Sequence, residues 1–291
     1  MPSNRLERIK YRLRQIKAGG NTRDIFAEAK RMKMHINTAL LMFEPPNVSP
    51  RNWHLREHTK FDRIFTWDPM LIDNNKYFQT YLPSPTTLSR PPDVLFSEKK
   101  LIVDISSNKR NCHYNSLSDF RYDTIKYFAK HYPNEFDLYG YGWNPNLFKW
   151  LFMQVKGSRI YLGKVVNYQG PVENKSEVLS KYRFSICFEN IKNQKGYISV
   201  KIFDTMRCGC VPVYYGAPDI EKYLPTNTFI DRSKFKNHAE LYQRLKTMSC
   251  KEHQEYVNNG IKFLESSQAK FFFSNYFSKN IISVLNLQKR N

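Results

Sequence analysis

Short apolar runs alternate with segments of helical periodicity over most of this chain. Buried strands are predicted for the apolar runs at 38–43, 61–67, 99–107, 136–139, 183–188 and 211–215. Helices are predicted where apolar residues share one helical face, at 68–78, 118–132, 176–182, 198–206, 238–248, 252–266 and 276–288. Strands that alternate with helices favour an α/β fold with parallel sheets.

A proline-rich stretch at 82–92 is the best candidate for a linker between two domains. The N-terminal domain, 1–92, is predicted to begin with two helices within 1–34. The larger domain is predicted to span 93–270. The last segment, 271–291, is expected to form a helix that packs back on the N-terminal domain.

The composition limits the partners that the protein can have. The 291 residues are 41% hydrophobic, enough for a large core, and carry a formal net charge of +20. This charge favours anionic partners, which include nucleotides, nucleic acids and acidic membrane surfaces, without choosing among them. The sequence contains no helix-turn-helix, zinc-finger or RNA-recognition pattern, so nucleic acid is not expected as a partner.

The cysteines and the N-terminus bear on the compartment. None of the five cysteines belongs to a CxxC pair or a zinc-type cluster, and Cys187, Cys208 and Cys210 are expected to be buried free thiols. No apolar run approaches the ~20 residues of a membrane span, and the basic N-terminus lacks the apolar core of a secretory signal. The expected location is cytoplasmic. The basic segment 1–17 leaves two alternatives open: a solvated helix, which is favoured, and peripheral contact with an anionic membrane at its inner face.

The segment 183–229 carries the clearest candidate chemistry. It is predicted to form a strand, a polar loop, a helix and a second strand. Ligands of an open α/β sheet bind outside the carboxyl ends of the strands, near helix N-termini. Polar residues crowd that edge here and predict a site for a phosphorylated ligand: Glu189, Asn190, Lys195, Tyr197, Ser199 and Lys201.

The same segment carries a family resemblance. FENIKNQKGYISVKIFD and CGCVPVYYGAPDIEKYLP resemble the signature of the α-1,3-fucosyltransferases, glycosyltransferase family 10. That signature combines a FEN triplet, a Tyr-Val/Ile-Thr/Ser-Glu-Lys helix start and a VPVYWGAP strand-turn. Further blocks of the bacterial members are matched in the same order by LLMFEPPNVSP, FDRIFTWDPMLIDNNKYF, ISSNKRN, FDLYGYGWN and YQGPVENKSEVLSKY.

The resemblance implies a GT-B architecture, in which two Rossmann-like domains face each other across a cleft. It implies transfer of L-fucose from GDP-fucose, with inversion, to a saccharide acceptor such as an N-acetylglucosamine-containing glycan, in an α-1,3-type linkage. It also implies that no metal or other cofactor is required. The segment before Glu44 is expected to lack the first strands of a complete Rossmann-like domain, so the N-terminal domain is expected to be shortened.

Site residues follow from the matched motifs. Glu44 corresponds to the general base, and a half-buried setting after its strand is expected to raise the pKa of its carboxyl group. Arg121 and Lys201 correspond to residues that contact the donor diphosphate. Asn190 and Tyr197 correspond to donor contacts. Glu189 and Lys109 are further candidate donor-binding residues, and Lys109 and Lys175 are candidate phosphate or loop contacts. Each has a second interpretation: Glu189 as a brace for its loop, and Lys109 and Lys175 as solvated lysines.

Three positions depart from the family pattern. Val200 replaces the motif carboxylate, Tyr141 replaces an arginine, and Tyr215 replaces a tryptophan. Losing a carboxylate that accepts hydrogen bonds from a sugar is expected to cost roughly ten- to a hundred-fold in binding. The alternative interpretation is therefore a nucleotide-sugar-binding homologue with an altered donor or lost activity.

Overall fold

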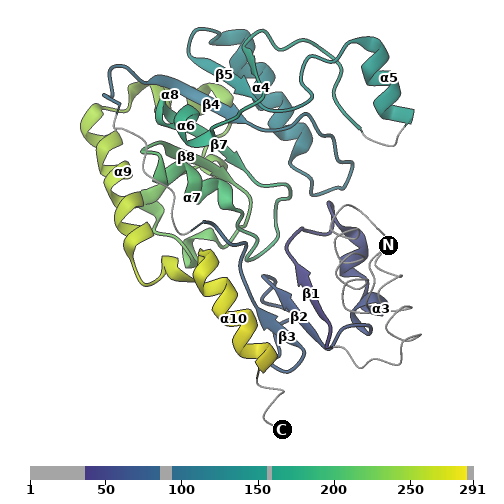
Figure 1. Cartoon of the computed structure of the whole chain (residues 1–291). Helices are drawn as coiled ribbons and strands as arrows, with labels where there is room; N and C mark the ends of the chain where they lie inside the picture. The colour runs from purple at the N-terminus through teal and green to yellow at the C-terminus, as the bar shows by residue number, and fades with distance from the viewer. Residues whose placement is uncertain (1–36, 86–93, 156–158, 287–291) are drawn as a thin grey trace, which may run out of the picture.

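Two parallel β-sheets form the framework of the protein (Figure 1). The computed structural model describes residues 37–85, 94–155 and 159–286. The helices predicted within 1–34 and most of the predicted linker lie outside these residues. All pairings within both sheets are parallel, which confirms the predicted α/β class.

The first sheet has three strands in chain order. They are β1 (Ala39–Met42), β2 (Arg63–Thr66) and β3 (Tyr77–Gln79). The connection between β1 and β2 contains the short helices η1 (Pro50–Trp53) and α3 (Leu55–His58). Met42, Ile64 and Phe65 are fully buried, so both β1 and β2 contribute to the core of this part.

The helix predicted at 68–78 is wrong. The Asp73 carboxylate accepts hydrogen bonds from the backbone N–H groups of Asn75, Lys76 and Tyr77, and Asn74 has a positive φ of 56°. A side chain that binds the following backbone offers an alternative to helical hydrogen bonds. The segment therefore turns at Asp73 and enters β3 at Tyr77.

The second sheet has six strands in the order β6-β5-β4-β7-β8-β9. In chain order this arrangement reads 3-2-1-4-5-6, the doubly wound order of dinucleotide-binding folds. Successive strands are added on one side of β4 up to β6 and on its other side from β7 onward. The topological switch point of the sheet therefore lies between β4 and β7. The strands are β4 (Lys100–Ile105), β5 (Phe136–Tyr139), β6 (Tyr168–Gly170), β7 (Tyr182–Phe188), β8 (Val211–Tyr215) and β9 (Ile230–Asp231).

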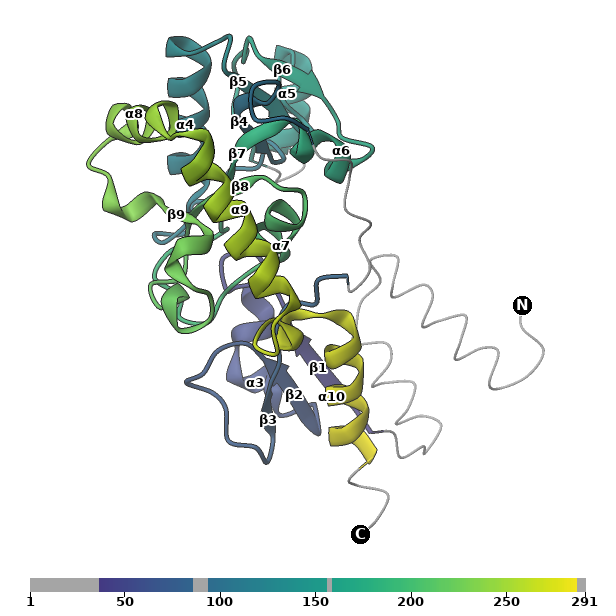
Figure 2. The ribbon, with the colours of Figure 1, turned by 90° about the vertical axis from the view of Figure 1, so that its left-hand side faces the viewer.

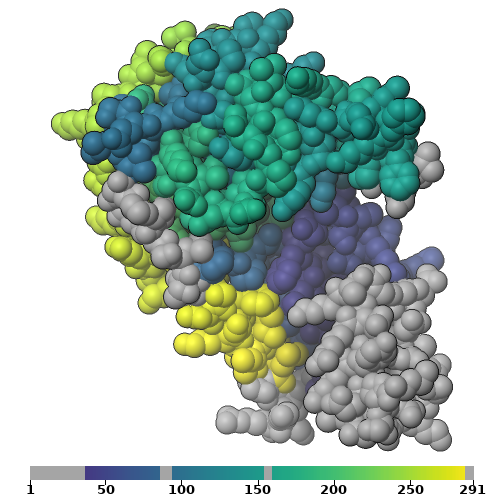
Figure 3. Space-filling view, turned by 45° about the horizontal axis from the view of Figure 1, so that its top comes forward, coloured from purple at the N-terminus to yellow at the C-terminus, as the bar shows by residue number. Residues whose placement is uncertain are grey.

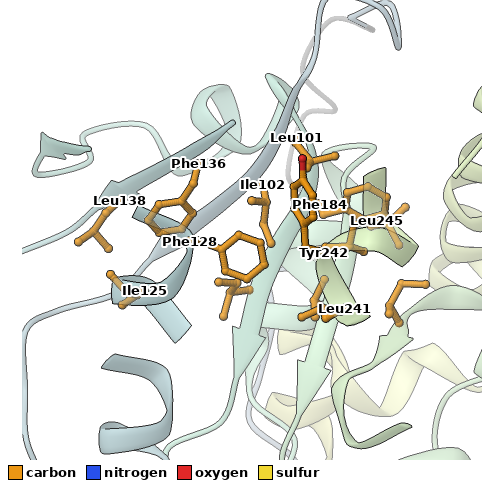
Figure 4. Close-up of a cluster of buried hydrophobic side chains, with 14 of the residues drawn as sticks. Leu101, Ile102, Ile125, Phe128, Phe136, Leu138, Phe184, Leu241, Tyr242 and Leu245 are labelled. Atoms are coloured by element: carbon orange, nitrogen blue, oxygen red, sulfur yellow. The ribbon is translucent and has the colours of Figure 1, made fainter. Parts of the chain in front are cut away.

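Helices cover both faces of this sheet. On β4, Ile102 packs in the cluster that contains Phe128 of α4 (Figure 4). Val103 packs on the opposite side with Leu179 of α6. Burial on both faces explains why the strand sequences are continuous apolar runs. The helices are α4 (Ser118–His131), α5 (Leu147–Val155), α6 (Lys175–Ser180), α7 (Val200–Arg207), α8 (His238–Thr247) and α9 (Cys250–Glu265).

Most of these elements agree with the sequence prediction. In the six-stranded part, the exceptions are α5, β6 and β9, which the apolar pattern did not reveal. In the three-stranded part, α3 and β3 were also not predicted. Cys187, Cys208 and Cys210 are buried and free, as predicted.

The C-terminal helix α10 (Ser274–Asn286) runs beside the three-stranded sheet (Figures 2 and 3). Asn280 Nδ2 donates to the Gln79 carbonyl at 2.8 Å, and the rings of Phe277 and Phe43 lie 5.4 Å apart. Ser84 forms a bridge with Phe273 just before α10. These contacts tie the end of the described chain to its N-terminal part.

Candidate active site

The switch point of the six-stranded sheet collects polar side chains. β4 ends at Ile105 and is followed by Ser106, while β7 ends at Phe188 and is followed by Glu189 and Asn190. Helices α4 and α7 begin near the same edge. A crevice outside the carboxyl ends of such strands is where open α/β sheets bind ligands. The topology thus brings together residues that lie about 80 positions apart in the sequence.

Arg121, in the first turn of α4, reaches this edge. Its Nη2 atom donates to the carbonyl oxygens of Phe188 and Glu189, both at 2.7 Å. A guanidinium group held on two backbone carbonyls has a fixed orientation, and its other N–H groups can bind an anion. The side chain is only partly buried, so solvent or a ligand can approach it.

Lys201, in the first turn of α7, meets Arg121 at the same strand end. Its Nζ atom donates to the Phe188 carbonyl at 3.0 Å and lies 3.6 Å from Glu189 Oε2. Burial lowers the pKa of the Lys201 ammonium group, against the opposing charge of Glu189. Two cations thus converge on one strand end at the N-terminus of a helix, and an anion there would be stabilised by both.

Glu189 is fully buried beneath the two cations. Its Oε1 atom accepts a hydrogen bond from the Ser199 N–H at 2.8 Å, so the carboxylate braces the start of α7. Gly216 makes room for it, because a Cβ atom at position 216 would lie 2.4 Å from Glu189 Cγ. Within the described chain, Glu189 Oε2 and Ser199 Oγ are buried without a hydrogen-bond partner. Buried polar groups normally have partners, so the Glu189 carboxylate depends on the charge of Lys201, whose Nζ atom lies 3.6 Å from Oε2.

Asp104 is a buried carboxylate that the sequence analysis missed. It is 1% exposed, its Oδ1 atom accepts a hydrogen bond from Ser106 Oγ, and Oδ2 has no hydrogen-bond partner within the described chain. Burial raises the pKa of Asp104, and the charges of Arg121 and Lys201 oppose that shift. Asp104 therefore lies close enough to both cations to influence them. Its position within an apolar run concealed it.

Tyr197 links this edge to the three-stranded part. It is 1% exposed, and its hydroxyl accepts a hydrogen bond from Asn190 Nδ2 at 3.4 Å. Burial, followed by the charges of Glu189 and Glu44, raises the pKa of the Tyr197 hydroxyl. Glu44 thus belongs to the electrostatic surroundings of a residue on the six-stranded side.

Two tryptophans hold the backbone at Glu44. Trp53 Nε1 donates to the Glu44 carbonyl and Trp67 Nε1 donates to the Phe43 carbonyl, both at 3.0 Å. The Trp67 ring lies 5.1 Å from the ring of Trp53 and 4.9 Å from that of Tyr197. These tilted ring contacts hold the end of β1 against the loop that precedes α7.

Hydrogen bonds from side chains to the backbone also join the two parts of the protein, at a junction around Glu44 and Tyr197. Asn47 Nδ2 donates to the Asn190 carbonyl at 2.8 Å, and Asn111 Nδ2 donates to the Asn47 carbonyl. Gly196 has a φ of +75°, and a Cβ atom there would lie 2.7 Å from the Trp67 carbonyl oxygen. The two parts of the protein therefore meet closely at the residues that flank Glu44 and Tyr197.

The side chain of Glu44 itself is exposed. The expected half-buried setting is wrong, because the two tryptophans bind the backbone carbonyls of Phe43 and Glu44 and leave the Glu44 carboxylate open. An exposed carboxylate at the junction can reach a solvent-borne acceptor.

Comparison with known proteins identifies the family. The model of glycosyltransferase family 10 (fucosyltransferase), C-terminal region, matches residues 98–260, more than half of the chain. The chain belongs to glycosyltransferase family 10. The matched region contains Arg121, Glu189 and Lys201, whereas Glu44 precedes it.

Similar sequences cover a shorter stretch of this family 10 chain. The α-(1,3)-fucosyltransferase FucT of Helicobacter pylori is 38% identical over 85 residues, which are 29% of this chain and 18% of the relative. The GDP-fucose protein O-fucosyltransferase 3 of Bos taurus is 35% identical over 94 residues, 31% of this chain and 20% of the relative. The chain thus matches about a fifth of the length of these relatives.

A solved structure supports the fold of this family 10 protein. HepE of Anabaena in complex with UDP gives a TM-score of 0.55 at 12% identity, covering 89% of this chain and 74% of that chain. At this identity the likeness concerns the fold alone. The protein has the GT-B architecture that the family resemblance implies, built on two separate parallel sheets.

The remaining candidates occupy different places around the family 10 site. Lys109 is exposed in the loop that follows β4. Lys175 Nζ pairs with Asp204 Oδ2 at 2.8 Å, which occupies its charge within the fold. Val200 opens α7 beside Lys201, and Tyr141 is 65% exposed in the turn after β5.

The described residues contain no cluster of three or more His, Cys, Asp or Glu side chains suited to a metal ion. None of their helices combines the length and apolar character needed to cross a bilayer.

Proposed function

We propose that this family 10 protein transfers L-fucose from GDP-fucose to a hydroxyl group of a saccharide acceptor, with inversion at the anomeric carbon. The observation that carries the proposal is the convergence of Arg121 and Lys201 on the end of β7, at the switch point of a doubly wound sheet. The relatives named for α-(1,3)-fucosyltransfer and for protein O-fucosylation support the donor. An α-1,3-type linkage to an N-acetylglucosamine-containing glycan is the proposed product.

Glu44 serves as the general base in this proposal. Its carboxylate takes the proton of the acceptor hydroxyl as that oxygen attacks the anomeric carbon of fucose. The new C–O bond forms on one face while the bond to the β-phosphate oxygen breaks on the other, which converts the β-linked donor into an α-linked product. A single displacement of this kind needs a base and no covalent nucleophile.

Arg121 and Lys201 stabilise the leaving group. The electron pair of the breaking bond stays on the diphosphate of GDP, where negative charge increases in the transition state. The two cations are already oriented by the Phe188 and Glu189 carbonyls, so little reorganisation is needed when that charge develops. Because these side chains supply positive charge at the diphosphate, we propose a reaction without a metal cofactor. Full activity in the presence of EDTA is the expected result.

A second candidate function is binding of a nucleotide sugar without efficient fucosyl transfer. Val200 favours it, since the family motif has a carboxylate at this position beside Lys201. The variant Val200→Glu separates the two. A gain in turnover of roughly tenfold with GDP-fucose is expected if the missing carboxylate limits sugar binding. No gain, or a loss, shows that Val200 is not a simple lesion.

The direct test is an acceptor screen over defined glycans with GDP-fucose as donor. UDP-glucose serves as the competing donor, because HepE has been solved with it. The expected result is transfer from GDP-fucose alone, with an α-linkage in the product by NMR, and loss of transfer in Glu44→Ala and Lys201→Ala. Transfer only from UDP-glucose, or a β-linked fucoside, would overturn the proposal.

A further inference from the structure

Helix α5 lies at the outer edge of the six-stranded part (Figure 1). It exposes an apolar surface. The exposed fractions are 56% for Leu147, 83% for Phe148, 47% for Leu151 and 56% for Phe152. The helix adds no carboxylate to its first turn. Scattered apolar residues are normal on a protein surface, but four on one short helix form a patch.

These four residues lie on one side of the helix. Their spacing of one, four and five positions places them within less than half of the helical circumference. The opposite side faces the protein: Trp150 is partly buried, and its Nε1 atom donates to the Ile160 carbonyl at 3.1 Å. The outward face is therefore the apolar one, which reverses the pattern of an ordinary surface helix.

The segment that contains this helix carries charge of one sign, and the carboxylate of Asp119 on α4 pairs with Arg110 beside it. The sequence contains no Asp or Glu between Asp137 and Glu173, although it contains Lys149, Lys156, Arg159 and Lys164. Lys149, Arg159 and Lys164 are exposed. Two further apolar side chains follow the helix: Leu162 is 45% exposed and Val166 is 77% exposed. Figure 3 shows the teal surface of this region projecting from the molecule.

We propose that the outward face of α5 docks on an anionic lipid bilayer, with Phe148 and Leu151 inserted at the boundary of headgroups and acyl chains. Helices that lie in a membrane interface combine an aromatic and aliphatic face with lysine and arginine beside it. Each basic residue near an anionic surface adds attraction, and this attraction weakens with salt. The proposal is independent of the proposed reaction.

The charge of the whole protein favours lipid over a second copy of the chain as the occupant. Each copy carries a formal net charge of +20, so α5 faces of two copies would bring like charges together. An anionic bilayer instead neutralises the lysines and arginine while it covers the apolar side chains.

Vesicle co-sedimentation tests the proposal with the full chain. The probes are vesicles of phosphatidylcholine alone and vesicles that also contain phosphatidylglycerol, each at low and high salt. The expected result is binding to the anionic vesicles, weakened by salt, and a loss of affinity of tenfold or more in Phe148→Ser/Leu151→Ser. The matched control, Met70→Ser/Leu95→Ser, changes apolar residues that are 80% and 66% exposed on other elements and should bind like the unchanged protein.

A charge-reversed N-terminus provides the comparison for the α5 variant. A variant with Arg12→Glu, Arg14→Glu and Lys17→Glu removes charge from the basic N-terminus, and circular dichroism checks that each variant is folded. Binding that is lost in the N-terminal variant and unchanged in Phe148→Ser/Leu151→Ser would overturn the assignment to α5. Equal sedimentation with neutral and anionic vesicles would also overturn it, as would a dimer in solution that the α5 variant dissociates.

Discussion

At the switch point of the six-stranded sheet, backbone carbonyls hold Arg121 and Lys201. Glu44, in contrast, follows strand β1 of the three-stranded sheet, and its position depends on contacts between the two parts. The first pair is fixed by the topology of one sheet and by the end of one strand. Glu44 is positioned through Trp53 and Trp67, and Trp67 packs against Tyr197 of the other part. The positions of Arg121 and Lys201 thus depend on one part of the protein, whereas the position of the proposed base depends on the junction between the two parts.

This difference predicts how variants divide. Changes at the switch point should weaken nucleotide binding. Changes at Glu44 or the junction should reduce transfer while nucleotide binding remains.

The largest effect is expected for Glu44→Gln. The variant keeps the shape of the side chain and removes the base, so kcat should fall by roughly 10²- to 10⁴-fold. The KM for GDP-fucose should change little, because the exposed carboxylate of Glu44 does not contact Arg121 or Lys201. Steady-state kinetics measure both quantities. Glu255→Gln, at an exposed position on α9, is the control and should behave like the unchanged enzyme.

Arg121→Lys should weaken GDP binding by roughly 10- to 100-fold, because a lysine cannot reproduce the fork held on two carbonyls. Fluorescence or calorimetric titration with GDP measures the loss. Arg110→Lys changes an exposed arginine that pairs with Asp119, and its affinity should be unchanged. Equal affinity in Arg121→Lys would show that the guanidinium group is structural only.

Gly196→Ala tests the junction. Alanine is strained at this φ, and its Cβ atom would press on the Trp67 carbonyl, so the free energy of unfolding should fall by about 1–3 kcal/mol. Gly170→Ala is a matched control, since Gly170 has a φ of +104° with nothing within 4 Å of its added Cβ. Denaturant unfolding should show a larger loss for Gly196→Ala. The same loss in both variants would mean that contact with Trp67 adds nothing.

Asp104→Asn should produce the smallest effect. Since the pKa of Asp104 is raised in the folded protein, the folded state binds more protons than the unfolded state between the ordinary carboxyl pKa and the raised one. Stability should therefore decline as pH rises through that window, and the variant should lack this part of the decline. Thermal unfolding should show a melting temperature on the order of 2 °C higher for the variant at neutral pH. Asp123→Asn, at an exposed position on α4, should show no such gain at any pH.

The sequence predicted the local structure around Lys201 better than the contacts at the junction. Glu189, Tyr197 and Lys201 lie within one strand-loop-helix stretch, where periodicity and turn residues reveal the local structure. Asp104 could not be recognised, because its burial near Arg121 and Lys201 results from strand pairing between distant segments. The roles of Trp53 and Trp67 in holding the Glu44 backbone are likewise tertiary.

Local chemistry also explains two errors of detail. The apolar residues of 68–78 suggested a helix, but the Asp73 side chain captures the following N–H groups. Helix α5 turns its most apolar face outward, so the rule that apolar residues mark the buried face of a helix does not describe it.

Isothermal titration calorimetry with GDP, on the unchanged protein and on Lys201→Ala, Lys222→Ala and Glu44→Gln, tests most directly whether the switch point is the nucleotide site. Lys222 is exposed and serves as the charge-matched control. The unchanged protein, Lys222→Ala and Glu44→Gln should bind GDP with the same affinity, and Lys201→Ala should bind at least roughly tenfold more weakly. No heat with the unchanged protein, or equal affinity in Lys201→Ala, would contradict a GDP site at the end of β7.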